Sequence, residues 1–345
     1  KTGSLAKKIR LDHNAIVGDV MSIDAEKDYV SESIYFGTAY NTTGTWQGKL
    51  VKISIPTATA SADLSTWTPA SADIKYLFAD NYPFTASPDV TKDDKGNIWI
   101  YVGSGKYYSD VDEADTSRQI FLGVKDAATV ITYPVSTTTA TVGVNKMDDR
   151  TGTTVTGTVT GTAQTCTFNQ SLNSGAGGFE MQTYVKSISA DPSTLPSVST
   201  VGWYIKLPAP TDTGVSTAER VITRPLAAGG LVDFLTYRPS SDACSYGGDS
   251  YIYAVGYTTG AAPTSVAISS SSITGGTTSG TVTVQQGMKL GPGAPPTGEA
   301  IIVPPPKEGE EQLQKKIQIA TGVIIEATNN TPISIATKIV HWLKK

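Results

Sequence analysis

The sequence predicts an all-β protein built as a propeller-like radial array of short antiparallel sheets, an incomplete β-propeller. Short segments of aromatic and β-branched residues recur, many reach a glycine, and polar turns or long polar insertions separate them. The clearest unit lies at residues 83–107, where a polar turn at 93–97 precedes the strand 98–102 and then Gly103. Such a strand is expected to pack on both faces and to turn tightly at its end.

The same pattern continues along the chain. Residues 220–226 and 231–237 flank the turn Ala228-Gly229-Gly230 and predict a hairpin. Further short strands are expected at residues 33–38, 48–55, 119–124, 250–255, 316–319, 323–326 and 339–342. In the segments 33–38 and 119–124 we expect the strand to end at the glycine, Gly37 or Gly123.

These segments suggest one domain over residues 1–345 with large insertions. The Thr- and Gly-rich stretch 136–196 is an insertion in which residues 154–161 predict an exposed hairpin, and residues 266–284 predict another. Residues 292–307 read as a Pro-rich connector, and 308–316 as either a short helix or a charged loop. The blades, or parts of blades, are expected at 13–56, 71–126, 185–238, 250–290 and 301–342.

Composition narrows the function classes. The net charge is −4 and only 17% of the 345 residues are charged, which supports neither a nucleic-acid footprint nor a polybasic membrane patch. No apolar stretch approaches the roughly 18 residues of a membrane span. The chain opens at Lys1 without a signal peptide, so we expect a mature protein or a fragment, and favour the fragment.

Cys166 and Cys244 are the two cysteines of the chain. Both lie in polar, turn-rich surroundings, where a disulfide bond of an exported protein is expected more than a buried thiol. Two free or metal-bound thiols are the alternative.

Enzyme motifs are sparse. His13 and His341 are far apart in the sequence, and neither lies near a nucleophile elbow or a zinc-protease motif. Residues 174–178 are Gly-rich but lack the strand-to-helix context of a phosphate loop. We therefore expect no catalysis; a propeller hydrolase or quinone-dependent dehydrogenase is the competing class, and it would need a cluster of His, Arg and Asp.

Residues 24–32 carry the most suggestive polar pattern. Carboxylates stand at loop positions 1, 3, 5 and 9, which are Asp24, Glu26, Asp28 and Glu32. The carbonyl of Val30 is available at position 7. Calcium-binding loops supply oxygen ligands at these positions. Tyr29 replaces the usual glycine at position 6, and position 12 is Tyr35 instead of a glutamate. A solvated acidic turn is the alternative. The acidic residues at 93–94 and 110–115 are expected to be plain surface.

Several segments together resemble the C-terminal β-propeller of the PilY proteins, the type IV pilus tip and biogenesis family. The resembling segments follow one order, at residues 17–20, 34–38, 85–88, 99–107, 119–126, 202–204, 219–221 and 239–254. The segment ending at His341-Trp342 resembles the family's closing strand more loosely.

The resemblance implies an extracellular protein at the tip or base of a retractile pilus that supports pilus biogenesis and surface attachment. Its expected partners are pilins or minor pilins, a host or abiotic surface, and an upstream segment of the same precursor that completes the propeller. The family's calcium loop would fall on Asp24, Glu26, Asp28 and Glu32. A structural subunit of an extracellular filament or envelope lattice is the alternative function.

Overall fold

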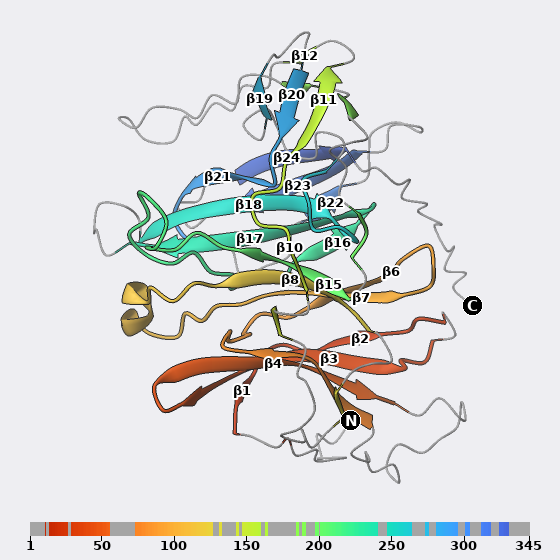
Figure 1. Cartoon of the computed structure of the whole chain (residues 1–345), viewed down its shortest axis with the longest axis vertical. Coiled ribbons are helices and arrows are strands. Elements are labelled where there is room, and N and C mark those ends of the chain that lie inside the picture. The colour runs from red at the N-terminus through yellow and green to blue at the C-terminus, as the bar shows by residue number, and fades with distance from the viewer. Residues whose placement is uncertain are drawn as a thin grey trace, which may run out of the picture.

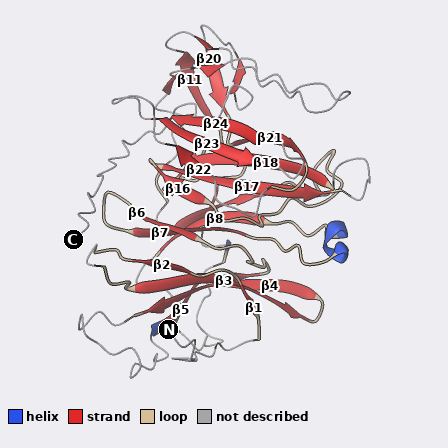
Figure 2. Ribbon diagram, turned by 180° about the vertical axis from the view of Figure 1, so that it is seen from behind, coloured by secondary structure: helices blue, strands red, loops and turns tan. Residues whose placement is uncertain are grey.

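Strands form nearly all of the regular structure in the computed structural model, and the 3₁₀ helix η2 (Asp110–Ala114) lies at the side of the molecule (Figures 1 and 2). Among the residues described, no helix is long and apolar enough to serve as a membrane span. The structure describes residues 11, 14–26, 29–55, 73–126, 131–132, 143–144, 147–159, 163–164, 184–185, 188–190, 197–199, 201–240, 247–263, 273–275, 281–295, 301–303, 312–318 and 324–330.

The first sheet is formed mainly by the N-terminal third of the chain. Its strand order is β1-β3-β4-β5-β9, and β2 also pairs with β3. The strands are β1 (Ile16–Val17), β2 (Met21–Ile23), β3 (Ser33–Thr42), β4 (Thr45–Ser54), β5 (Ile74–Asp80) and β9 (Ile131–Thr132).

The second sheet has the order β10-β15-β8-β7-β6 and is antiparallel apart from the pair β10 and β15. It consists of β6 (Asp89–Lys92), β7 (Ile98–Gly103), β8 (Ile120–Lys125), β10 (Asp148–Asp149) and β15 (Gly202–Lys206). The predicted turn at 93–97 joins β6 to β7, as expected.

The third sheet has the order β16-β17-β18-β21. Its strands are β16 (Leu226–Ala228), β17 (Leu231–Pro239), β18 (Gly248–Gly256) and β21 (Gly287–Pro292). Gly229 and Gly230 both have positive φ, 58° and 84°, in the turn between β16 and β17. This turn and the strand that follows it confirm the predicted hairpin, because two-residue hairpin turns favour residues that tolerate positive φ. The first arm was predicted at 220–226, but β16 begins only at Leu226.

Three smaller sheets complete the described part of the chain. The first has the order β22-β23-β24, the second β14-β11-β20-β19, and the third pairs β12 with β13. Their strands are β22 (Ile301–Val303), β23 (Gln312–Gln318), β24 (Ile324–Asn330), β11 (Val155–Val159), β14 (Ile188–Ala190), β19 (Ile273–Gly275), β20 (Thr281–Val284), β12 (Ala163–Gln164) and β13 (Tyr184–Val185).

The sheets lie one above another along the long axis and form an open, propeller-like array (Figure 1). Strand β7 shows how the layers are held together. Ile100 and Val102 belong to the core between the first and second sheets, whereas Trp99 and Tyr101 belong to the core between the second and third. Each such fully buried side chain contributes about 1.5–3 kcal/mol. The prediction that this strand packs on both faces is confirmed.

The glycines explain how closely neighbouring segments approach. A Cβ on Gly37 would lie 2.4 Å from Cβ of Phe84, and one on Gly123 would lie 2.6 Å from the indole ring of Trp203. The prediction that these two glycines end their strands is wrong, because β3 and β8 continue past them. They are glycine because a side chain or backbone packs directly on the strand. At Gly103 the strand does end, as predicted.

The predicted blade boundaries are partly wrong. β5 pairs with β4 of the first sheet instead of opening the second unit, β15 pairs with β8 across the long insertion, and β18 joins β17 of the third sheet instead of opening a separate unit. Turn residues mark where a strand stops, but the sheet that it joins depends on packing between distant segments. A local pattern therefore cannot assign it.

The Pro-rich and charged segments also differ from expectation. Residues 301–303 form β22 inside the predicted connector, and residues 312–316 are part of strand β23 instead of a helix or a charged loop. β23 is paired on both sides, with β22 and with β24. This pairing satisfies the backbone groups of a segment too short to form a stable helix.

The two Thr-rich segments form one sheet. β11 pairs with β20 and β14 instead of folding back on itself, so the predicted hairpin at 154–161 is wrong. β19 and β20 form the predicted second hairpin. The resulting sheet projects from one end of the stack (Figure 1).

Candidate functional site

The predicted calcium loop connects β2 to β3 at the edge of the first sheet. The N–H of Glu32 donates to the carbonyl of Ile23 at 3.0 Å and closes the loop. Tyr29 has φ of 70° and a side chain that is 95% exposed. The chain therefore makes its sharp turn at loop position 6 with a tyrosine, at the position where calcium loops carry glycine.

Two predicted ligands turn back onto the loop. Oδ2 of Asp24 accepts the N–H of Tyr29, and Oε2 of Glu32 accepts the N–H of Ala25, both at 2.7 Å. Oε1 of Glu32 is buried and has no hydrogen-bond partner among the described residues. Nζ of Lys92 donates to the carbonyl of Ala25 at 3.2 Å, so one cation already lies beside the loop.

The described residues contain no group of three or more His, Cys, Asp or Glu side chains arranged to hold a metal ion. Asp28 lies outside the described residues. The unpartnered Oε1 of Glu32 and the left-handed turn at Tyr29 are the features of the described loop that bear on cation binding.

Cys166, Cys244, His13 and His341 are all outside the described residues, as is the Gly-rich segment 174–178. The disulfide bond remains a prediction.

The prediction that the acidic residues at 93–94 and 110–115 are plain surface is wrong for Asp93 and Asp112, which are buried, whereas Asp94 and Asp110 are exposed. Asp112, in η2, is 5% exposed and forms an ion pair with the buried Lys106, whose Nζ also lies 3.7 Å from Asp115. Asp93 accepts hydrogen bonds from Asn97 and from Nε1 of Trp99 at 3.0 Å. Buried carboxylates need such donors, and the sequence alone does not reveal that the partners lie close by.

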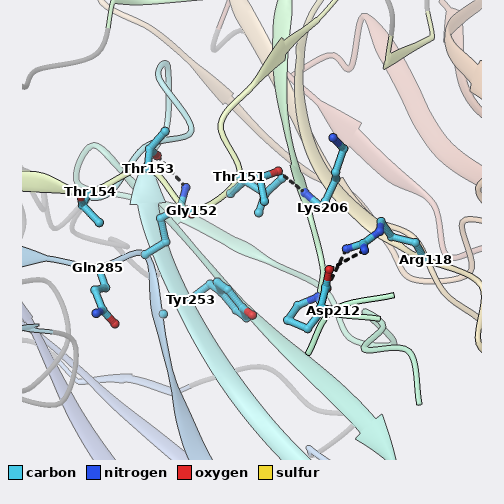
Figure 3. Close-up of a pocket in the computed structure, with 13 residues that line it drawn as sticks. Arg118, Thr151, Gly152, Thr153, Thr154, Lys206, Asp212, Tyr253 and Gln285 are labelled. Atoms are coloured by element: carbon cyan, nitrogen blue, oxygen red, sulfur yellow. Dashed lines mark hydrogen bonds and ion pairs between the residues drawn. The ribbon is translucent and has the colours of Figure 1, made fainter. Parts of the chain in front are cut away.

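A pocket that the sequence did not indicate opens where the second and third sheets meet the chain leading into β11 (Figure 3). Its volume is about 800 Å³. Five separate stretches of the chain line it, contributing Arg118; Thr151, Gly152, Thr153 and Thr154; Ile205, Lys206, Pro208 and Asp212; Tyr253; and Gln285, Gln286 and Gly287. No local motif connects these segments, which is why sequence reasoning missed them.

Both cations of the pocket are paired. Arg118 donates from both terminal nitrogens to Asp212, at 3.0 and 2.8 Å, and Nζ of Lys206 lies 2.7 Å from Asp149. Burial alone would raise the pKa of Asp149, but hydrogen bonds from Lys206 and Thr151 outweigh it and lower the pKa to about 2. The hydrogen bond from Arg118 likewise lowers the pKa of Asp212. Both pairs are therefore ionised at neutral pH.

Comparison with known proteins identifies the architecture. No protein-family model matches the sequence, and no curated protein matches it significantly. Among solved structures, the C-terminal domain of Pseudomonas aeruginosa PilY1 superposes with a TM-score of 0.57 at 14% sequence identity, and the match covers 96% of this chain. The chain has the fold of the PilY1 C-terminal domain. It covers 64% of the PilY1 structure's length.

The PilY1-like fold confirms the predicted class, an all-β array without complete closure in the described part. The likeness extends over nearly the whole chain. At 14% identity it establishes the fold. The roles of the β2–β3 loop and of the pocket are argued from their own residues.

Proposed function

We propose that this chain is a non-catalytic, extracellular module of a type IV pilus system that supports pilus assembly and attachment to surfaces. The observation that carries the proposal is the PilY1 C-terminal fold over 96% of the chain. The ordered set of sequence segments that resemble the PilY family supports it independently, because those segments were identified without the structure. Pilins or minor pilins are the proposed partners.

The proposal of a non-catalytic role rests on the residue chemistry of the chain. Two histidines in 345 residues, neither beside a nucleophile motif, leave little for acid–base or nucleophilic catalysis. The charged residues of the pocket are held in ion pairs, which suits binding and support better than proton transfer.

We further propose that the β2–β3 loop binds calcium. Asp24, Glu26, Asp28 and Glu32 would hold the ion together with the carbonyl of Val30. Bound calcium would supply the positive charge that allows these carboxylates to lie close together. The unpartnered Oε1 of Glu32 and the left-handed turn at Tyr29 support this assignment.

Calcium is expected to raise the melting temperature in a concentration-dependent way, because it binds the folded state in preference to the unfolded chain. Differential scanning calorimetry with millimolar calcium or with chelator measures this. Asp28→Ala should abolish the response while leaving the calcium-free protein nearly unchanged. Identical melting curves with calcium and with chelator would leave the loop as an ordinary acidic turn.

The pilus role is tested in the organism that encodes the chain. Deletion of the gene should reduce both surface piliation and attachment, and immunogold labelling should place the protein at pilus tips as a minor species. Labelling along the whole length of a fibre would instead support the alternative, a structural filament subunit. The sheet formed by the two Thr-rich segments is the observation that favours that alternative, because it projects from the stack as a separate contact surface.

A further inference from the structure

We propose that the pocket between the second and third sheets is a binding site for a neutral carbohydrate, a segment of one or a few sugar units. The pocket volume of about 800 Å³ falls in the range of small-ligand sites, which is roughly 300–1,000 Å³. Three properties of the lining favour such a ligand: its charge balance, its hydrogen-bonding groups and its aromatic wall.

The charge balance favours an uncharged ligand. Arg118 and Lys206 are the cations that line the pocket, and each is already paired with a carboxylate, Asp212 or Asp149. An anionic ligand would have to compete with these carboxylates, and a cationic ligand with the two basic side chains. A neutral ligand can accept or donate hydrogen bonds at the edges of both pairs without breaking either one.

Much of the polar lining is held in place before any ligand binds. The amide nitrogen of Gln286 donates to the carbonyls of Arg150 and Gly260, at 2.9 and 2.8 Å, and to the hydroxyl of Thr153 at 3.0 Å. The hydroxyl of Thr151 accepts the N–H of Lys206 at 2.8 Å and donates to Asp149. These bonds fix the backbone around the opening, which lowers the entropic cost of binding.

Two polar side chains of the lining remain available. Gln285 and Thr154 make no side-chain hydrogen bond within the described part of the chain, and both line the pocket (Figure 3). Together they offer an amide donor, an amide acceptor and a hydroxyl. This combination complements sugar hydroxyls, which both donate and accept.

The pocket also has a fixed aromatic wall. Tyr253 stacks on Phe234 with ring centroids 4.8 Å apart, and Phe234 stacks on Phe121. The hydroxyl of Tyr253 donates to Glu219 at 2.7 Å, which locks the ring. Gly287 is the partner of Tyr253 on the neighbouring strand β21, and a Cβ on Gly287 would lie 2.6 Å from the tyrosine ring. A rigid ring beside hydrogen-bonding groups is the usual composition of a small-ligand site, and it suits the mixed apolar and hydroxyl faces of a sugar.

The test uses the purified chain and isothermal titration calorimetry. The probes are neutral oligosaccharides (cellohexaose, chitohexaose, maltohexaose and mannohexaose) and one anionic oligosaccharide, hexagalacturonate. We expect at least one neutral probe to bind with a dissociation constant in the millimolar range or tighter, and hexagalacturonate to bind at least tenfold more weakly. No binding of any neutral probe at 10 mM, or preferential binding of hexagalacturonate, would overturn the proposal.

Two substitutions locate the site. Gln285→Ala and Thr154→Val should each weaken binding by about tenfold, whereas the matched controls Gln47→Ala and Thr45→Val, on β4 of the first sheet, should not change it. Equal affinity in the pocket variants and the controls would place any sugar site elsewhere and contradict the proposal. Because these measurements need only the isolated chain, their outcome is independent of whether the protein acts on a pilus.

Discussion

At the scale of single residues, two adjacent charged side chains are buried inside the all-β core. Arg220 is 2% exposed and Glu219 is fully buried. The guanidinium of Arg220 donates to the carbonyls of Lys106, Asp112, Asp115 and Ala218, so one side chain supports the η2 excursion. Glu219 accepts from Thr236 and Tyr253 through Oε1, and its Oε2 has no partner among the described residues. The guanidinium of Arg220 therefore has several hydrogen-bond acceptors, whereas one carboxyl oxygen of Glu219 has no donor among the described residues.

Arg220→Met should therefore destabilise the protein by about 3–5 kcal/mol, because it leaves several buried carbonyl oxygens without donors. Urea unfolding followed by tryptophan fluorescence measures the loss. Arg118→Met, which removes a more exposed guanidinium, should cost about 1 kcal/mol or less. Similar losses in the two variants would show that the carbonyl contacts of Arg220 contribute little.

Glu219 should make stability depend on pH. Its ordinary pKa is 4.5, and burial raises the pKa in the folded state despite the hydrogen bonds from Thr236 and Tyr253 and the nearby Arg238. Below pH 4.5 the Glu219 carboxyl is protonated in both the folded and the unfolded protein, so it does not lower the free energy of unfolding. As the pH rises above 4.5 the unfolded chain ionises first, so the free energy of unfolding falls until the folded pKa is passed.

Glu219→Gln removes this ionisation, so the variant should gain stability relative to the wild type as the pH rises. Urea unfolding of both proteins at pH 4.5 and at pH 7.5 gives the comparison, since all other groups titrate alike in the two. A stability difference that is the same at both pH values would contradict the raised pKa.

At the scale of elements, glycines inside strands determine how closely neighbouring segments pack. Gly103 at the end of β7 is a clear case, since a Cβ there would lie 2.2 Å from both Cβ and Cγ2 of Val221. Well-packed interiors have no room for an extra methyl group, so backbone or side chains must shift. The strand-and-glycine pattern of the sequence therefore records contacts between segments far apart in the chain.

Gly103→Ala should destabilise the protein by about 2 kcal/mol or more through overpacking. Gly44→Ala is the control: Gly44 has φ of 91° but nothing within 4 Å of an added Cβ, so only the left-handed backbone is penalised, by about 1 kcal/mol. The free energies of unfolding of both variants are compared by urea denaturation. A smaller loss at Gly103 than at Gly44 would argue against close packing at Val221.

At the scale of the whole molecule, strands distant in sequence hold the array together. β8 pairs with β15 across the long insertion, and β11 pairs with β20 across the segment that contains β15 to β18. Pairings of this kind carry a large entropic cost of loop closure, and a covalent link between distant segments reduces it. The predicted Cys166–Cys244 bond would act in this way, because it would tie the insertion to the segment between β17 and β18.

If the bond forms, the oxidised protein should be more stable than the reduced protein by about 4 kcal/mol, provided the bond is unstrained. Intact-mass measurement after alkylation without reductant should find neither cysteine modified. Two alkylated thiols in the native, unreduced protein would exclude the bond.

Local sequence patterns were enough to predict the fold class and many of the strands and turns. Alternating and β-branched runs have a local physical cause, as at residues 98–102, and the Gly229-Gly230 turn requires positive φ whatever surrounds it. The position of the acidic loop before β3 is local for the same reason. Such strands, turns and loop positions depend on residues that are neighbours in the sequence, so a local pattern can predict them.

Only the tertiary structure decided which strands share a sheet and which polar residues are buried. Asp93 and Asp112 look like surface residues until Trp99 and Lys106 are seen beside them, and the helix or charged loop expected at 308–316 gives way to a strand once β22 and β24 flank it. The pocket has the same origin, because its lining comes from five separate stretches of the chain. Burial and strand pairing depend on contacts between distant segments of the chain, so a local sequence pattern cannot predict them.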